Sequence, residues 1–89
     1  MKFDPGQVVM TPGALEAIRA SGDDPLALLL RHVNLDPGDL SPEDIRENEL
    51  SLQNGWRILS AYRLSDGVRI WIITESDRSS TCLLLPEEY

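Results

Sequence analysis

Residues 57–85 read RILSAYRLSDGVRIWIITESDRSSTCLLL and contain three apolar, strand-like runs separated by two short polar segments. The three runs are Arg57 to Leu64, Val68 to Thr74 and Thr81 to Leu85. Ser65-Asp66-Gly67 predicts a tight hairpin turn, because Asp-Gly readily adopts the positive φ that such turns need. Residues 76–79 are polar and predict the second turn. This segment therefore predicts a three-stranded antiparallel β-meander.

Both faces of the predicted sheet are apolar. Successive side chains of a strand point to opposite faces, so one face is expected to carry Ile58, Ser60, Tyr62, Leu64, Val68, Ile70, Ile72, Thr81, Leu83 and Leu85. The opposite face is expected to carry Leu59, Ala61, Trp71, Ile73, Cys82 and Leu84. An antiparallel sheet with one wet face normally alternates apolar with polar residues. We therefore expect short helices to cover one face, and the N-terminal arm, a wrapping helix or another molecule to cover the second.

Three helices are predicted before the sheet, because a capping residue is followed by proline at Thr11-Pro12, Asp24-Pro25 and Ser41-Pro42. The predicted helices run from Pro12 to about Ala20, from Pro25 to about Val33 and from Pro42 to about Asn54. By helical spacing, the residues expected to face the core are Leu15, Ile18, Leu26, Leu29, Leu30, Val33, Ile45, Leu50 and Leu52. The segment Gly6 to Met10 predicts a fourth short strand or an extended arm.

The chain has 89 residues, which fits one small domain of the α+β class. We expect an arm and two or three short helices in residues 1–55, the β-meander in residues 56–86 and a tail in residues 87–89. No apolar run is long enough to span a membrane, and the single cysteine cannot form an internal disulfide. These features predict a cytoplasmic protein without membrane association.

The net charge is −7, which argues against direct binding to nucleic acid, since such binding needs a basic surface. Acidic residues gather between Asp36 and Glu49, against Arg46 alone. One interpretation of this stretch is a solvated loop and helix. The alternative is an acidic DNA mimic that occupies a nucleic-acid-binding host protein.

Few residues of the sequence suggest a metal, cofactor or catalytic site. One histidine and one cysteine do not make a metal site, the glycines are scattered, and no cofactor is expected. Cys82 alternates with leucines and is expected in the core. An alternative hypothesis makes His32 a general base beside Arg78 and Ser79, in a small toxin-like ribonuclease or other hydrolase.

The second sheet face favours a binding role over an enzymatic one. The residues expected at a partner interface are Leu59, Ala61, Trp71, Ile73 and Arg78. Trp56 is expected to plug the edge of the core, and Tyr89 is either solvated or docked on the sheet or a partner. We therefore expect a non-enzymatic protein–protein interaction or regulatory module. The expected partner is a second copy in a homodimer or another protein.

The chain resembles a family of small "plasmid-related" proteins encoded on bacterial plasmids and integrative elements. The matching residues are Arg57-Ile58-Leu59-Ser60, Tyr62, Gly67, residues 70–75 (IWIITE), Asp77-Arg78-Ser79 and residues 84–89 (LLPEEY), with TPGALEAI at 11–18 and RHV at 31–33. The sequence departs from the family after Val33, where similar proteins tend to have a tryptophan. The family has no established activity, so the resemblance implies a bacterial mobile-element context and assigns no functional residue.

Overall fold

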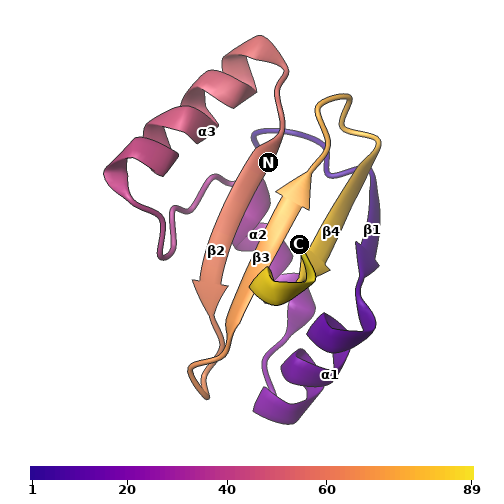
Figure 1. The fold of residues 1–89 in the computed structure, drawn as a ribbon. Helices are drawn as coiled ribbons and strands as arrows, with labels where there is room; N and C mark the ends of the chain where they lie inside the picture. The colour runs from indigo at the N-terminus through magenta and orange to yellow at the C-terminus, as the bar shows by residue number, and fades with distance from the viewer.

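A four-stranded mixed sheet with three helices forms the fold, as the computed structural model of residues 1–89 shows (Figure 1). The strands are β1 (Gln7–Met10), β2 (Ile58–Arg63), β3 (Arg69–Thr74) and β4 (Ser80–Leu84). The helices are α1 (Pro12–Ser21), α2 (Pro25–Val33) and α3 (Pro42–Asn54), and a 3-10 turn, η1 (Pro86–Glu88), ends the chain. Strands β2, β3 and β4 are antiparallel neighbours, and β1 pairs with β4 in parallel, in the order β1-β4-β3-β2. The predicted α+β class, meander and fourth strand are confirmed.

Each helix begins where its capping residue predicted. The side chains of Thr11, Asp24 and Ser41 accept a backbone N–H of the first helical turn at 3.1, 3.0 and 3.2 Å, and a proline follows each one. Helices α1 and α3 end at Gly22 and Gly55, which adopt the left-handed conformation that glycine tolerates best.

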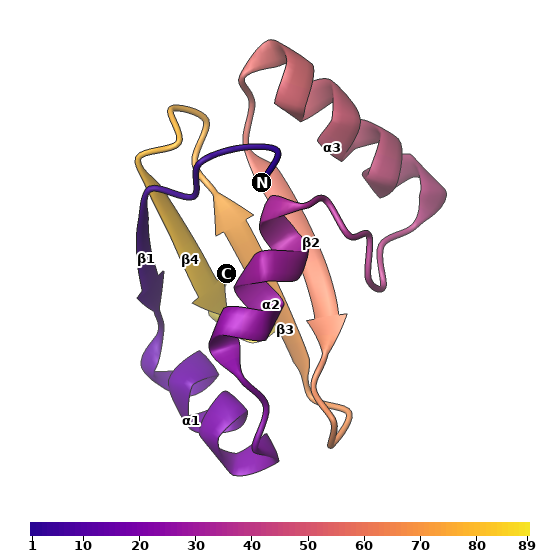
Figure 2. The ribbon, with the colours of Figure 1, turned by 180° about the vertical axis from the view of Figure 1, so that it is seen from behind.

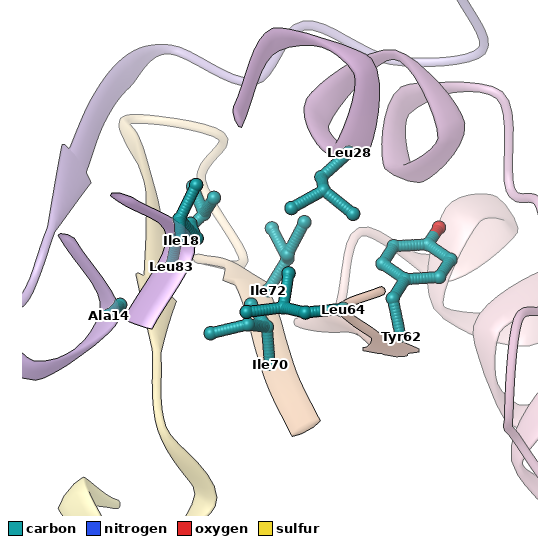
Figure 3. Packing of buried hydrophobic residues seen from close by; sticks show 8 residues of the cluster. All are labelled: Ala14, Ile18, Leu28, Tyr62, Leu64, Ile70, Ile72 and Leu83. Carbon is teal, nitrogen blue, oxygen red and sulfur yellow. The ribbon is translucent and has the colours of Figure 1, made fainter. Parts of the chain in front are cut away.

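The core lies between one face of the sheet and the helices α1 and α2. These helices cover the face that is turned away from the viewer in Figure 1 and toward the viewer in Figure 2. We call this the helix face. Its main cluster consists of Ala14, Ile18, Leu28, Tyr62, Leu64, Ile70, Ile72 and Leu83 (Figure 3). A second cluster of Phe3, Val33 and Ile58 extends the core toward α3, where Leu52 packs against it. Burying these side chains is the main source of stability, at about 25 cal/mol for each Å² of apolar surface removed from water.

The predicted buried face of α2 is correct at Leu29 and Val33 and wrong at Leu26 and Leu30. Leu26 and Leu30 are 58% and 51% exposed, whereas Leu28 and His32 are buried. A nine-residue helix rich in leucine offers apolar residues on more than one side, so apolar spacing alone does not select its buried face. Polar contacts between His32 and the sheet accompany the observed rotation.

Helices α1 and α3 also bury smaller residues than predicted. In α1, Ile18 is buried as predicted, whereas Leu15 is 40% exposed and Ala14 is fully buried in its place. In α3, Leu50 is 46% exposed, and the buried residues are Asn48 and Ser51. Trp56, predicted to plug the core edge, is 50% exposed, since its backbone rather than its ring takes part in the turn after α3.

The outer edge of β2 is closed by side-chain and loop contacts. The amide of Asn48 donates to the carbonyl oxygen of Leu59 and accepts the Leu59 N–H at 3.1 Å. In the loop before α3, Asp39 N–H donates to the carbonyl oxygen of Ala61 at 2.8 Å. These contacts occupy the backbone groups that a further strand would need.

None of the three α-helices covers the second face of the sheet, which carries only the short C-terminal η1 (Figure 1). The N-terminal arm does not cover it, because Phe3 packs into the core on the helix face. Residues 87–89, expected as a free tail, instead turn back through η1, which contacts β3. No helix in the structure has the length and apolarity required to cross a membrane.

Candidate functional site

The second face, which we call the open face, is an apolar surface that runs across all four strands. The register aligns Leu59, Ile73, Cys82 and Val9 in one row. A second row holds Ala61, Trp71 and Leu84. Ile73 and Leu84 are 6% exposed, whereas Leu59, Ala61, Trp71 and Cys82 are half-buried and Val9 is 44% exposed. Apolar side chains in this state gain further burial when a partner covers them.

The C-terminal turn covers only part of the open face, as Figure 1 shows. The ring of Tyr89 meets Trp71 edge to face at a centroid distance of 5.7 Å, and its hydroxyl accepts a hydrogen bond from Arg57 at 2.6 Å. Tyr89 nevertheless remains 70% exposed. Its ring therefore docks on the sheet, as one of the two predicted alternatives for this residue states, and leaves most of the face uncovered.

Glu88 holds this turn in place. Its carboxylate accepts the Thr11 hydroxyl at 2.5 Å and the Leu85 N–H at 2.8 Å, which joins the end of the chain to the start of α1. The Thr11 hydrogen bond, followed by that of Leu85, lowers the pKa of Glu88 below its ordinary value. The carboxylate also lies so close to Gly13 that a β-carbon there would come within 2.6 Å of it.

Arg78 does not offer its guanidinium to a partner. Its nitrogens donate to the carbonyl oxygens of Trp56, Glu75, Ser51 and Ser76, at 2.6, 3.1, 3.2 and 3.3 Å. Its own backbone has a φ of 60°, a rare conformation for a residue with a side chain. Arg78 thus connects the β3–β4 turn to the end of α3. Unlike the other predicted interface residues, it uses its side chain for contacts within the chain.

His32 lies at the centre of a buried chain of hydrogen bonds. Its ring nitrogen Nδ1 is 2.6 Å from the Ser60 hydroxyl, and Nε2 is 2.8 Å from the Thr74 hydroxyl. Thr74 in turn contacts Thr81 at 2.6 Å, and Thr81 donates to the carbonyl oxygen of Pro5 at 2.6 Å. Because that carbonyl can only accept, each hydroxyl donates toward Pro5, which places the proton of the neutral imidazole on Nε2 and makes Nδ1 the acceptor.

The surroundings of His32 hold it neutral and away from solvent. Burial lowers the pKa of His32 from its ordinary 6.5 to about 4. The imidazole is fully buried, and no buried side-chain nitrogen or oxygen atom in the structure lacks a hydrogen-bond partner. Both nitrogens are used internally, so the histidine acts here as a core residue that connects α2 to β2, β3 and β4.

The three residues of the hydrolase hypothesis do not form one site. His32 and Arg78 each contact the ring of Phe3. The His32 imidazole meets this ring edge to face at a centroid distance of 5.2 Å, and the Arg78 guanidinium lies over it at 5.6 Å from its centroid. Ser79 lies exposed in the β3–β4 turn, where its N–H donates to Asp77. The structure has no pocket that could hold a substrate and no cluster of metal-ligating residues.

The acidic stretch is partly neutralised within the chain. Asp36 pairs with Arg31 at 2.8 Å, and Asp39 pairs with Arg63 at 3.1 Å. The hydrogen bond from Arg31 lowers the pKa of Asp36 below its ordinary value. The remaining acids of this stretch lie exposed on α3, namely Glu43, Asp44, Glu47 and Glu49.

The predicted interface residues mostly share one surface. Leu59, Ala61, Trp71 and Ile73 lie on the open face, as the alternation of the strands predicted. Val9 also lies on this face, which the sequence did not predict, because an isolated run of four residues does not reveal which strand it pairs with. The polar helix-face residues Ser60, Thr74 and Thr81 could have signalled a buried partner such as His32.

Comparisons with protein-family models, with curated proteins and with solved structures give no match to this chain.

Proposed function

We propose that this protein is a non-enzymatic interaction module that binds another protein through the open face of its sheet. One observation carries the proposal: the apolar row of Leu59, Ile73, Cys82 and Val9 crosses the whole sheet on the side without helices. In a small domain such a surface is costly to leave in contact with water, and a partner that covers it recovers this free energy.

The charge around the open face suggests the character of the partner. Arg63 and Arg69 are directly opposite each other on β2 and β3, and both side chains are exposed. Asp39 pairs with Arg63 from the loop before α3. Arg69 makes no ion pair, so a partner with an apolar centre and an acidic group beside it fits this face best.

The cellular setting of the proposal follows from the family resemblance. Proteins of the similar family occur on plasmids and integrative elements, so the module is proposed to act in the accessory gene set of a bacterial mobile element, in the cytoplasm. There it would regulate or counter a host system by contact. A hydrolase role gains no support from the buried, internally bonded His32.

Ala61→Glu tests this proposal, because Ala61 is half-buried on the open face, beside Trp71. Ile73 is less suitable, since it is only 6% exposed and a charge there would unfold the domain. Leu30→Glu is a matched control, because Leu30 is 51% exposed on the outer side of α2.

The assay is capture of partners from a bacterial lysate by immobilised wild type, Ala61→Glu and Leu30→Glu, after circular dichroism shows that all three are folded. We expect a protein that binds the wild type and Leu30→Glu and is lost with Ala61→Glu. The proposal fails if the folded Ala61→Glu variant retains every protein that the wild type captures, or if the wild type captures none.

A further inference from the structure

We propose that two copies of this chain pair through their β1 strands, antiparallel, so that two four-stranded sheets form one continuous sheet. This contact uses backbone groups at the edge of the sheet, whereas the proposed function uses side chains of the open face, to which the Val9 side chain also belongs. The inference concerns Gln7, Val8, Val9 and Met10, all of which are exposed.

The outer edge of β1 has free backbone groups. On the side facing β4, the Gln7 N–H donates to the carbonyl oxygen of Ser79, just before β4, and the Thr11 N–H donates to that of Leu83 in β4, at 3.0 Å each. Alternate residues of a strand bond the same neighbour, so Val9 also points toward β4. The backbone groups of Val8 and Met10 then point away from the sheet, and no backbone hydrogen bond to a turn or loop involves them.

The free groups are self-complementary. An antiparallel second copy would place Val8 opposite the partner's Met10 and Met10 opposite the partner's Val8, and each such pair would exchange both backbone hydrogen bonds. The two-fold axis would pass between the two Val9 residues, which would face each other. No residue of β1 is charged, so this contact brings no like charges into direct opposition although each chain carries a net charge of −7.

The flanking prolines limit the length of the pairing. Pro5 and Pro12 bracket the strand and have no N–H to donate, so neither can extend the ladder. In addition, β1 contains no lysine, proline or bulge that would protect this edge from pairing.

The closed opposite edge limits the assembly to two chains. Asn48 and Asp39 already bond the outer backbone groups of β2. A chain with two free edges could polymerise, whereas a chain with one free edge forms a closed pair. The pairing also places the apolar rows of both copies side by side, with Val9 next to the partner's Val9.

The test compares masses in solution by light scattering. The wild type should be close to twice the 10.0 kDa chain mass at high concentration. Val8→Pro should reduce this to the single chain mass, because proline removes an outward N–H and leaves the bonds to β4 intact. Ala61→Glu, which alters the open face alone, should keep the dimer mass.

A charge exchange at Val9 tests the register. Val9→Lys alone and Val9→Glu alone should be monomers, because like charges would meet at the two-fold axis. An equimolar mixture of the two variants should recover the dimer mass. This experiment also tests the proposed pairing if Val8→Pro does not fold.

A wild-type chain that remains monomeric at millimolar concentration would overturn the pairing, and so would a folded Val8→Pro variant or single Val9 variants that remain dimers. Loss of the dimer in Ala61→Glu together with its retention in Val8→Pro would assign self-association to the open face instead. Partner capture is scored separately, so failure of the dimer and failure of the proposed function are distinguishable.

Discussion

Lowering the pH from neutral should destabilise this protein through its single histidine. His32 is buried, with both ring nitrogens bonded to hydroxyls, and its pKa is lowered from 6.5 to about 4 by burial. In the unfolded chain the imidazole takes up a proton once the pH falls below 6.5, whereas in the folded protein it stays neutral down to about pH 4. The unfolded state therefore binds more protons in this window, and the free energy of unfolding falls with the pH.

The size of the effect follows from the two pKa values. The stability that the neutral His32 contributes is fully present above pH 6.5 and is lost as the pH falls toward 4. Integration of the proton linkage from about pH 7 to about pH 5 gives a loss of about 2 kcal/mol. The carboxyl groups contribute little to this interval, because the ordinary pKa values of aspartate and glutamate are 3.8 and 4.5 and those that shift, such as Asp36 and Glu88, are lowered.

Urea unfolding, followed by tryptophan fluorescence at the two pH values, measures this loss. His32→Asn is the matched control: it keeps a polar side chain at this position but cannot titrate, so its stability should change by less than about 0.5 kcal/mol over the same interval. The histidine resonance of the folded wild type should not titrate above pH 5. A resonance that titrates near 6.5, or a wild-type stability equal at both pH values, would refute the reasoning.

Two further substitutions test contacts that hold the sheet to α3. Asn48→Ala leaves the N–H and carbonyl of Leu59 without their side-chain partner, so we expect the free energy of unfolding to fall by about 1–3 kcal/mol in urea titrations. The exposed Asn54→Ala control should change it by no more than about 0.5 kcal/mol, and an equal effect of both would contradict this role of Asn48. Arg78→Lys cannot bond the carbonyl oxygens of Trp56, Ser51 and the turn at once, and we expect a loss of about 1–3 kcal/mol. An unchanged melting temperature would show that the guanidinium contacts do not stabilise the turn.

Local signals in the sequence were sufficient for most of the fold. The capping residues Thr11, Asp24 and Ser41 each act on the backbone of their own first turn, so their effect does not depend on the rest of the protein. The alternation in β2 and β3 likewise assigns Leu59, Ala61, Trp71 and Ile73 to one face whatever the strands pack against. For this reason four of the five predicted interface residues share one surface.

The predictions from the sequence fail where contacts between distant segments determine how a residue is placed. Leu26 and Leu30 have the spacing of a buried face, but α2 is rotated to place His32 between Ser60 and Thr74, residues 28 and 42 positions away. Arg78 looks like a free cation in a polar turn, and its role depends on carbonyl oxygens at the end of α3. The pairing of β1 with β4 joins segments more than 70 positions apart, which local periodicity cannot reveal.

The parallel pairing of β1 with β4 also shapes how the protein folds. The hairpins of the meander close short loops, whereas β1 docks only after β4 is present, and closing so long a loop has a high entropic cost. We therefore expect β1 to join a preformed meander late in folding. The hydrogen bond from Thr11 to Glu88 and that from Thr81 to Pro5 fasten the same closure. Until β1 has docked, the outer edge of β4 is unpaired, so a chain at that stage exposes an apolar strand that is prone to aggregation.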